Sequence, residues 1–160
     1  AGCVASGLRM TSLAISTPTG RMVLTEEAGA ITRVRWSEAE AGNGSALLDE
    51  AARQIEAYFA GARTAFDLPL RVEGSTLVKL VCSQMRKIPF GETTTYGAIS
   101  KKLGFSAQAI GGACGANPIP LIIPCHRVLG ANGLGGFSGG AGVETKVALL
   151  KHEGAAGLLI

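Results

Sequence analysis

The sequence predicts an α/β N-terminal domain, with a small antiparallel sheet and one helix, followed by a mainly α-helical C-terminal domain with a helix-turn-helix. Three observations predict this class. Short β-prone runs come first, one amphipathic helical segment follows them, and the second half reads as short helices separated by Gly and Pro. Glu73-Gly74 is the expected boundary between residues 1–72 and 73–160. The 160 residues, 47% of them hydrophobic, suffice for one substantial core or for two small domains that share an interface.

The N-terminal sheet is expected to have three strands, at residues 11–16, 22–25 and 31–36. The first strand ends at Thr17-Pro18-Thr19-Gly20, which is a turn signal. Residues 39–45 contain two Gly and one Asn and predict a flexible loop before the helix.

The helix of this domain is predicted by apolar residues that recur at helical spacing and form a single face. That face consists of Leu47, Leu48, Ala51, Ala52, Ile55, Tyr58 and Phe59. Gly61 ends the helix. Residues 66–70 form a short extended segment, and Pro69 predicts that it lies at an edge of the sheet or leaves it. We expect the whole domain to act as structural support.

The C-terminal domain begins with a helix that Ser75 or Thr76 can cap and that runs to about Lys87. Its inward-facing residues are expected to be Leu77, Leu80, Val81 and Met85. Two short helices follow, at residues 96–103 and from 107 to about 116, with Thr95 and Ser106 as caps and Gly104 between them. Two short helices joined by a tight turn that contains Gly are typical of a helix-turn-helix.

The second helix of this pair consists mostly of small residues. They are Ala107, Ala109, Gly111, Gly112, Ala113, Gly115 and Ala116. Inside a helix, each Gly costs about 1 kcal/mol relative to Ala. The small residues therefore indicate a close approach, either by another helix of the protein or by a nucleic-acid groove, and the sequence leaves both open.

The charge of the chain is unevenly distributed. Residues 1–72 carry seven Lys or Arg and eight Asp or Glu, a net charge of −1, whereas residues 73–160 carry eight and four, a net charge of +4. A basic half is compatible with a polyanion such as nucleic acid. Ordinary scatter of surface charge explains the same numbers.

The four cysteines are Cys3, Cys82, Cys114 and Cys125. They form no C-x-x-C pair and only two His accompany them, which argues against a structural zinc site and a disulfide scaffold. We expect no metal and no cofactor. Residues 1–20 contain no continuous apolar signal segment, and no apolar stretch is long enough to span a membrane. The expected setting is therefore the reducing cytoplasm, without a membrane partner.

The most informative segment is an apolar run that ends on Pro124-Cys125-His126-Arg127-Val128. A thiolate is the nucleophilic form of Cys, and an adjacent base such as His126 can generate it. Consecutive side chains of a strand point to opposite faces, so direct contact between Cys125 and His126 requires a turn or a bridging water. A third group should orient the imidazole, and Glu153 is the available carboxylate after a final helix at residues 143–152, apolar at Val143, Val147 and Leu150.

At these positions the sequence resembles the O6-alkylguanine-DNA alkyltransferase family. The resemblance covers most of the chain, and its most specific part is Pro124 to Val128 with Asn117-Pro118 upstream. Its other parts are residues 58–61, 66–70, 88–93, 95–97, 111–113, 137–140 and 149–153. Alkyltransferase-like proteins have Trp at the acceptor position, whereas this chain has Cys125.

The resemblance implies a DNA-repair role in which a monomer takes an alkyl group from O6 of guanine in double-stranded DNA, once and irreversibly. Cys125 would be the acceptor, His126 would take its proton through a water, and Glu153 would orient His126. Asn117 would brace the turn, and Tyr96 would protonate the leaving guanine. Backbone groups of Cys125, Val128 and Ser138 would bind the base, beside Phe137. The helix at residues 107–116 would enter the minor groove of a duplex whose target base is flipped out. The implied DNA contacts are Thr95, Tyr96, Ala107, Gln108, Gly112 and Arg127.

Three positions depart from the family's pattern. Gln108 stands where the family usually has an Arg finger that fills the space left by the flipped base. Cys82 stands where relatives often carry Trp, and Gly115-Ala116 replaces a pair that is often more basic or polar. These departures predict weaker duplex affinity with an intact acceptor.

Two other functions remain open at this stage. A non-catalytic sensor of alkylated DNA would bind the lesion without transfer, so stoichiometric labelling of Cys125 separates it from a transferase. A Cys-His-Glu hydrolase would turn over many substrate molecules per chain and would need no helix-turn-helix.

Overall fold

The computed structural model describes residues 10–155, so Cys3 lies outside the described residues. The chain forms two compact units, Ala1–Val72 and Glu73–Ile160. No helix among residues 10–155 combines the length and the apolar character that a bilayer crossing requires.

The first unit contains the predicted antiparallel sheet. Its strands are β1 (Met10–Thr17), β2 (Gly20–Glu27) and β3 (Ala30–Trp36), in the order β1-β2-β3. The turn between β1 and β2 has only two residues, Pro18 and Thr19, and the register of β2 against β3 shifts between Thr25 and Glu26. All three strands are longer than predicted, because hairpin pairing continues into polar residues that carry no apolar pattern.

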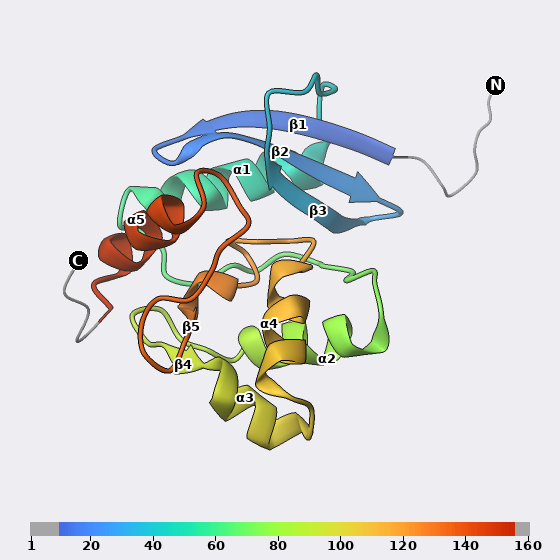
Figure 1. Ribbon diagram of the computed structural model, residues 1–160. Coiled ribbons are helices and arrows are strands. Elements are labelled where there is room, and N and C mark those ends of the chain that lie inside the picture. Colours follow the sequence, from blue (N-terminus) through green and yellow to red (C-terminus); the bar gives the residue numbers. More distant parts are fainter. Residues whose placement is uncertain (1–9, 156–160) are drawn as a thin grey trace. The chain divides into compact units, whose positions relative to one another are not determined.

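Helix α1 (Ala46–Phe59) packs across one face of this sheet (Figure 1). The Ser45 hydroxyl caps it and accepts a hydrogen bond from the Leu48 amide at 3.1 Å. Leu48, Ala51, Ile55 and Tyr58 are buried, as the helical spacing predicted.

The segment after α1 runs along the edge of the sheet. The Ile31 amide donates to the Pro69 carbonyl at 2.9 Å, and the Arg71 amide donates to the Ile31 carbonyl at 3.0 Å. Pro69 contributes only its carbonyl to this pairing, which is why an edge tolerates it. The edge position that Pro69 predicted is therefore confirmed.

The second unit is mainly helical. Its helices are α2 (Thr76–Met85), α3 (Tyr96–Leu103), α4 (Ala107–Gly115) and α5 (Val143–Glu153). A two-residue parallel pair joins β4 (Thr94–Thr95) to β5 (Val128–Leu129). The hydroxyls of Ser75, Thr95 and Ser106 cap α2, α3 and α4, and α3 ends at Gly104 in the left-handed conformation. Helices α3 and α4 lie side by side as the predicted helix-turn-helix (Figure 1).

The predicted helix faces are correct only in part. Val81 and Met85 of α2 are buried as predicted, but Leu80 is 39% exposed, and Val78 and Cys82 complete the buried face, which packs toward α4 and the turn that carries Cys125. In α5, Val143 is 43% exposed. Its buried face consists of Thr145, Lys146, Leu149, Leu150 and Glu153. Leu150 is buried, but apolar spacing missed the rest of this face, because it ignores buried polar residues that have partners within the fold.

Candidate active site and DNA-facing helix

Asn117 holds the turn that presents Cys125. Its Nδ2 donates to the Ile123 carbonyl at 2.9 Å, and its Oδ1 accepts from the Ile119 amide at 2.9 Å. The turn includes Leu121 at φ 75°, a left-handed conformation that is rare for a residue other than Gly. A side chain with both a donor and an acceptor is needed to bridge these two backbone groups, and Asn provides both.

The Cys125 thiol is buried in a short 3-10 helix, Cys125–Arg127, and only 8% of the residue is exposed. Burial raises the pKa of this thiol, because the charged thiolate is disfavoured away from water. A hydrogen bond from Asn117 and the charge of Lys146 act in the opposite direction. The resting group is therefore a neutral thiol that must give up its proton when it reacts.

His126 lies directly against Glu153. The distance from His126 Nε2 to Glu153 Oε2 is 2.7 Å, and both side chains are fully buried. Burial lowers the pKa of His126, although the hydrogen bond to Glu153 raises it. A neutral imidazole that donates from Nε2 to a carboxylate leaves Nδ1 as the basic nitrogen. Nδ1 is buried and has no hydrogen-bond partner among the described atoms, so it is available to accept a proton.

Arg127 also binds Glu153 and is buried inside the fold. Its Nε donates to Oε1 at 2.8 Å, its Nη2 donates to Oε2 at 2.9 Å, and its Nη1 donates to the Ile88 carbonyl at 2.6 Å. The residue is 6% exposed. The assignment of Arg127 to DNA binding is therefore wrong, because its donors are used inside the fold to hold the carboxylate that orients His126.

A pocket of about 450 Å³ opens beside Cys125. It is lined by Tyr96, Gly111, Cys114, Gly115, Cys125, Gly136, Phe137 and Ser138. The structure thus brings Tyr96, Phe137 and Ser138 together with the thiol. Val128 is fully buried and is not part of this lining, and its carbonyl already accepts a hydrogen bond from Lys146 at 2.7 Å.

Tyr96 packs tightly against the loop that forms one wall of this pocket. A Cβ at Gly135 would lie 2.8 Å from Tyr96 Cε2, so only Gly fits there, and its φ of +75° favours Gly as well. Burial raises the pKa of Tyr96, and a hydrogen bond with the Gly136 backbone acts against that shift. The hydroxyl therefore stays protonated at neutral pH.

Lys146 is a site residue that the sequence analysis missed. It is fully buried in α5, and its Nζ donates to the carbonyls of Val128, Leu134 and Gly136 at 2.7, 2.5 and 3.1 Å. Lys146 thus ties the pocket loop, which contains Leu134 and Gly136, to β5, and it places a positive charge near Cys125. The helical period contained the signal, since Lys146, Leu150 and Glu153 recur on one face.

Cys82 and Cys114 were not predicted to be site residues either. Cys82 Sγ donates to Asn117 Oδ1 at 3.7 Å, and burial raises the pKa of Cys82 to about 11. Cys114 shares the pocket with Cys125, and burial raises its pKa to about 12. Both therefore remain protonated and are poor nucleophiles at neutral pH.

The small residues of α4 divide into two groups. Ile110, Ala113 and Cys114 face the protein interior. A Cβ added at Gly111, Gly112 or Gly115 would meet nothing within 4 Å. No close packing within the described chain requires these glycines, which favours an external partner. Ala107, Gln108 and Gly112 are exposed on the same helix, and the cap residue Thr95 is exposed at the start of α3.

Comparison with known families decides the assignment. The profile described as "6-O-methylguanine DNA methyltransferase, DNA binding domain" matches residues 76–155, and that described as "6-O-methylguanine DNA methyltransferase, ribonuclease-like domain" matches residues 11–72. The chain belongs to the 6-O-methylguanine DNA methyltransferase family. The residues that surround Cys125 all lie within the first match.

Relatives of this family are similar along much of the chain. A Methanosarcina acetivorans protein named methylated-DNA–protein-cysteine methyltransferase is 49% identical over 108 residues, which cover 66% of this chain and 68% of the relative. A Mycobacterium tuberculosis protein of the same name is 42% identical over 125 residues, which cover 76% and 72%.

Solved structures of the family have the same fold. The crystal structure of Mycobacterium tuberculosis O6-methylguanine methyltransferase superposes with a TM-score of 0.83 at 34% identity and covers 95% of this chain and 97% of its own. The complex of the Mycobacterium tuberculosis protein with DNA gives a TM-score of 0.80 at 38% identity and covers 88% and 91%.

Proposed function

We propose that the protein repairs DNA by a single irreversible transfer, in which an alkyl group leaves O6 of guanine in a duplex and ends on Cys125. The observation that carries this proposal is the buried thiol at the pocket, with His126 and Glu153 behind it, in a chain of this family. The protein would act as a monomer. A cytoplasmic location belongs to the same proposal, because the reaction needs a reduced thiol.

The proposed reaction is a displacement at the alkyl carbon. Cys125 Sγ forms the new bond to that carbon, the bond from the carbon to guanine O6 breaks, and its electron pair stays on the guanine. The thiol proton passes through a water to His126, whose positive charge Glu153 stabilises. The Tyr96 hydroxyl protonates the departing base, while Phe137 and the backbone of Ser138 position it. The product is a thioether, so each chain reacts once.

The proposed DNA contact is made by α4. The target base must leave the helix stack to reach a buried thiol, which costs a few kcal/mol. Exposed glycines allow the α4 backbone to lie close to the minor groove, and Thr95, Ala107, Gln108 and Gly112 supply contacts around it. The first unit, Ala1–Val72, would serve as structural support.

Gly112→Ala should change stability and DNA affinity in opposite directions. Ala stabilises a helix interior by about 1 kcal/mol relative to Gly, and the new Cβ meets no described atom within 4 Å. The same methyl group blocks close approach to the duplex, so affinity should fall. Urea denaturation and fluorescence anisotropy with a labelled duplex measure the two effects. An unchanged affinity would mean that this face of α4 does not touch DNA.

Gln108→Arg should bind duplex DNA more tightly. The Arg side chain is longer and charged, so it adds attraction to phosphates and can stack in the space left by a flipped base. The affinity gain should shrink as salt is raised, and anisotropy titrations at two salt concentrations measure it. Equal affinities of the two proteins would count against α4 as the inserted helix.

The transfer rate should fall at acid pH, but only below the ordinary histidine pKa of about 6.5. The direction follows from His126, whose pKa is lowered by burial. Above that lowered pKa the imidazole is neutral and can accept the thiol proton, and below it the rate should drop about tenfold per pH unit. Single-turnover rates from pH 5 to 8 test this, with circular dichroism at each pH as the folding control. An acid limb centred above pH 6.5 would contradict the role of His126.

The proposed function is tested by intact-mass spectrometry after the protein is mixed with a duplex that contains one O6-methylguanine. We expect a mass increase of one methylene group, because a methyl replaces the thiol hydrogen, and saturation at one per chain. The Cys125→Ser variant should show no increase. Lesion-selective binding without a mass change would favour the sensor, and many turnovers per chain would favour a hydrolase.

A further inference from the structure

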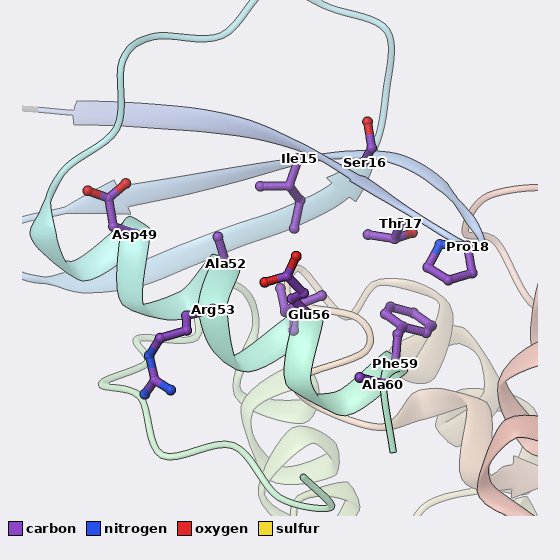
Figure 2. Close-up of a pocket in the computed structure, with 11 residues that line it drawn as sticks. Ile15, Ser16, Thr17, Pro18, Asp49, Ala52, Arg53, Glu56, Phe59 and Ala60 are labelled. Atoms are coloured by element: carbon purple, nitrogen blue, oxygen red, sulfur yellow. The ribbon is translucent and has the colours of Figure 1, made fainter. Parts of the chain in front are cut away.

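The first unit contains a groove of about 790 Å³ between β1 and α1 (Figure 2). Ile15, Ser16 and Thr17 of β1 form one wall, and residues on one side of α1 form the other. It is larger than the pocket beside Cys125 and shares no residue with it. The proposed alkyl transfer does not use this groove.

The wall formed by β1 is the edge of the sheet, because β1 pairs only with β2 among residues 10–155. Thr17 pairs with Gly20 across a two-residue turn, so alternate residues Ser12, Ala14 and Ser16 direct their backbone N–H and C=O groups away from β2. The Ser12 carbonyl accepts a hydrogen bond from the Gly44 amide at 2.9 Å, which confirms this register. The loop that contains Gly44, between β3 and α1, thus covers the edge only as far as Ser12. The outward backbone groups of Ala14 and Ser16 have no partner within residues 10–155.

The opposite wall is apolar with two carboxylates. Ala52 and Phe59 provide apolar surface, and Asp49 and Glu56 lie seven residues apart on the same side of α1, a rise of about 10 Å. Figure 2 shows the side chains of Asp49 and Glu56 on the side of α1 that faces β1, whereas Arg53 extends away from it. Arg53 also lines the groove, but Glu50 holds its guanidinium through bonds of 2.9 and 2.5 Å, so its charge is compensated and the two carboxylates leave the groove net negative. Neither Asp49 nor Glu56 has a side-chain partner in the described part of the chain.

We propose that this groove binds an extended basic segment of a partner protein, which adds to β1 as a fourth strand. Its backbone would pair with the open groups of Ala14 and Ser16, as in other cases of strand addition. An apolar side chain would rest on Ile15 and Phe59, and flanking Lys or Arg side chains would meet Asp49 and Glu56. The two carboxylates repel phosphates, which makes nucleic acid the wrong occupant.

The test uses the full chain and a fluorescein-labelled peptide, Gly-Lys-Thr-Val-Thr-Lys-Gly, in fluorescence anisotropy titrations. We expect saturable binding that weakens with salt, and none for the same peptide with Glu in place of both Lys. Glu56→Lys should weaken binding about tenfold, as the loss of a charge-assisted bond does. Glu40→Lys, an exposed charge reversal outside the groove, is the matched control and should leave binding unchanged.

A second variant tests the strand pairing itself. Ser16→Pro removes one outward N–H at an edge position that tolerates Pro, and it should also weaken binding. Methyl transfer to Cys125 should stay normal in every variant, which shows that each is folded and separates this proposal from the proposed repair function. Equal effects of Glu56→Lys and Glu40→Lys, or the absence of peptide binding, would overturn the groove as a docking site.

Discussion

Glu153→Gln is expected to destabilise the protein by about 3 kcal/mol and to slow methyl transfer by about two orders of magnitude. Glu153 is the only described carboxylate that meets both His126 and Arg127, and its side chain is fully buried. Removing one member of a buried ion pair leaves an uncompensated charge, which costs about 3–5 kcal/mol. The Gln oxygen recovers part of that cost, because it can still accept one hydrogen bond.

The loss of transfer has a separate cause. Without a carboxylate, the imidazolium that forms at His126 loses its stabilising charge, and a general base typically contributes about 10²- to 10⁴-fold to rate. Urea denaturation and single-turnover rates measure the two effects. Glu144→Gln is the matched control, because Glu144 is exposed in the first turn of the same helix. If the two variants behave alike, the buried network around Glu153 does not support the site.

Lys146→Met is expected to produce the second-largest effect. Methionine has a similar length but no donor, so the carbonyls of Val128, Leu134 and Gly136 lose a shared partner. Each unsatisfied buried group costs about 1–3 kcal/mol, and removal of the buried charge offsets part of the sum. We expect a net destabilisation of about 2 kcal/mol and a looser pocket loop.

The same substitution should also impair the thiol. The charge of Lys146 lowers the pKa of Cys125, so its removal should raise that pKa and slow transfer about tenfold or more at neutral pH. Lys151→Met, at an exposed position of the same helix, should have neither effect. Transfer rates at several pH values distinguish loop damage from the lost charge, since Lys146 lowers the pKa of both Cys125 and His126 and only the loss of its charge shifts the profile to higher pH. An unchanged profile would remove Lys146 from the electrostatics of the site.

Local sequence signals predicted the elements well. The caps Ser75, Thr95 and Ser106 and the stop at Gly104 are fixed by hydrogen bonds or dihedral angles within a few residues, so they can be read without the fold. The resemblance implied that Cys125, Tyr96, Phe137 and Ser138 serve one site, and the structure places all four in the lining of one pocket.

Features that depend on distant partners were missed. Arg127 was among the DNA contacts that the resemblance implied, whereas Glu153 lies beside it only in the folded chain. Lys146 was overlooked because a charged residue is expected at the surface, and its three carbonyl partners come from other segments. The exposure of Leu80 has the same origin, since α2 packs toward α4 with Val78 and Cys82 buried and Leu80 outside the contact.

Peptide mapping after reaction with an O6-methylguanine duplex shows whether Cys125 is the residue that accepts the methyl group. Free Cys82 and Cys114 lie nearby in the fold, and trypsin leaves Cys114 and Cys125 on one peptide because it cleaves after Lys102 and Arg127. Fragmentation of that peptide therefore has to locate the methyl group. We predict that Cys125 carries all of it, while Cys82 and Cys114 remain free to react with iodoacetamide. A methyl group on Cys82 or Cys114, or an unmodified Cys125 after complete repair of the duplex, would contradict the proposed mechanism.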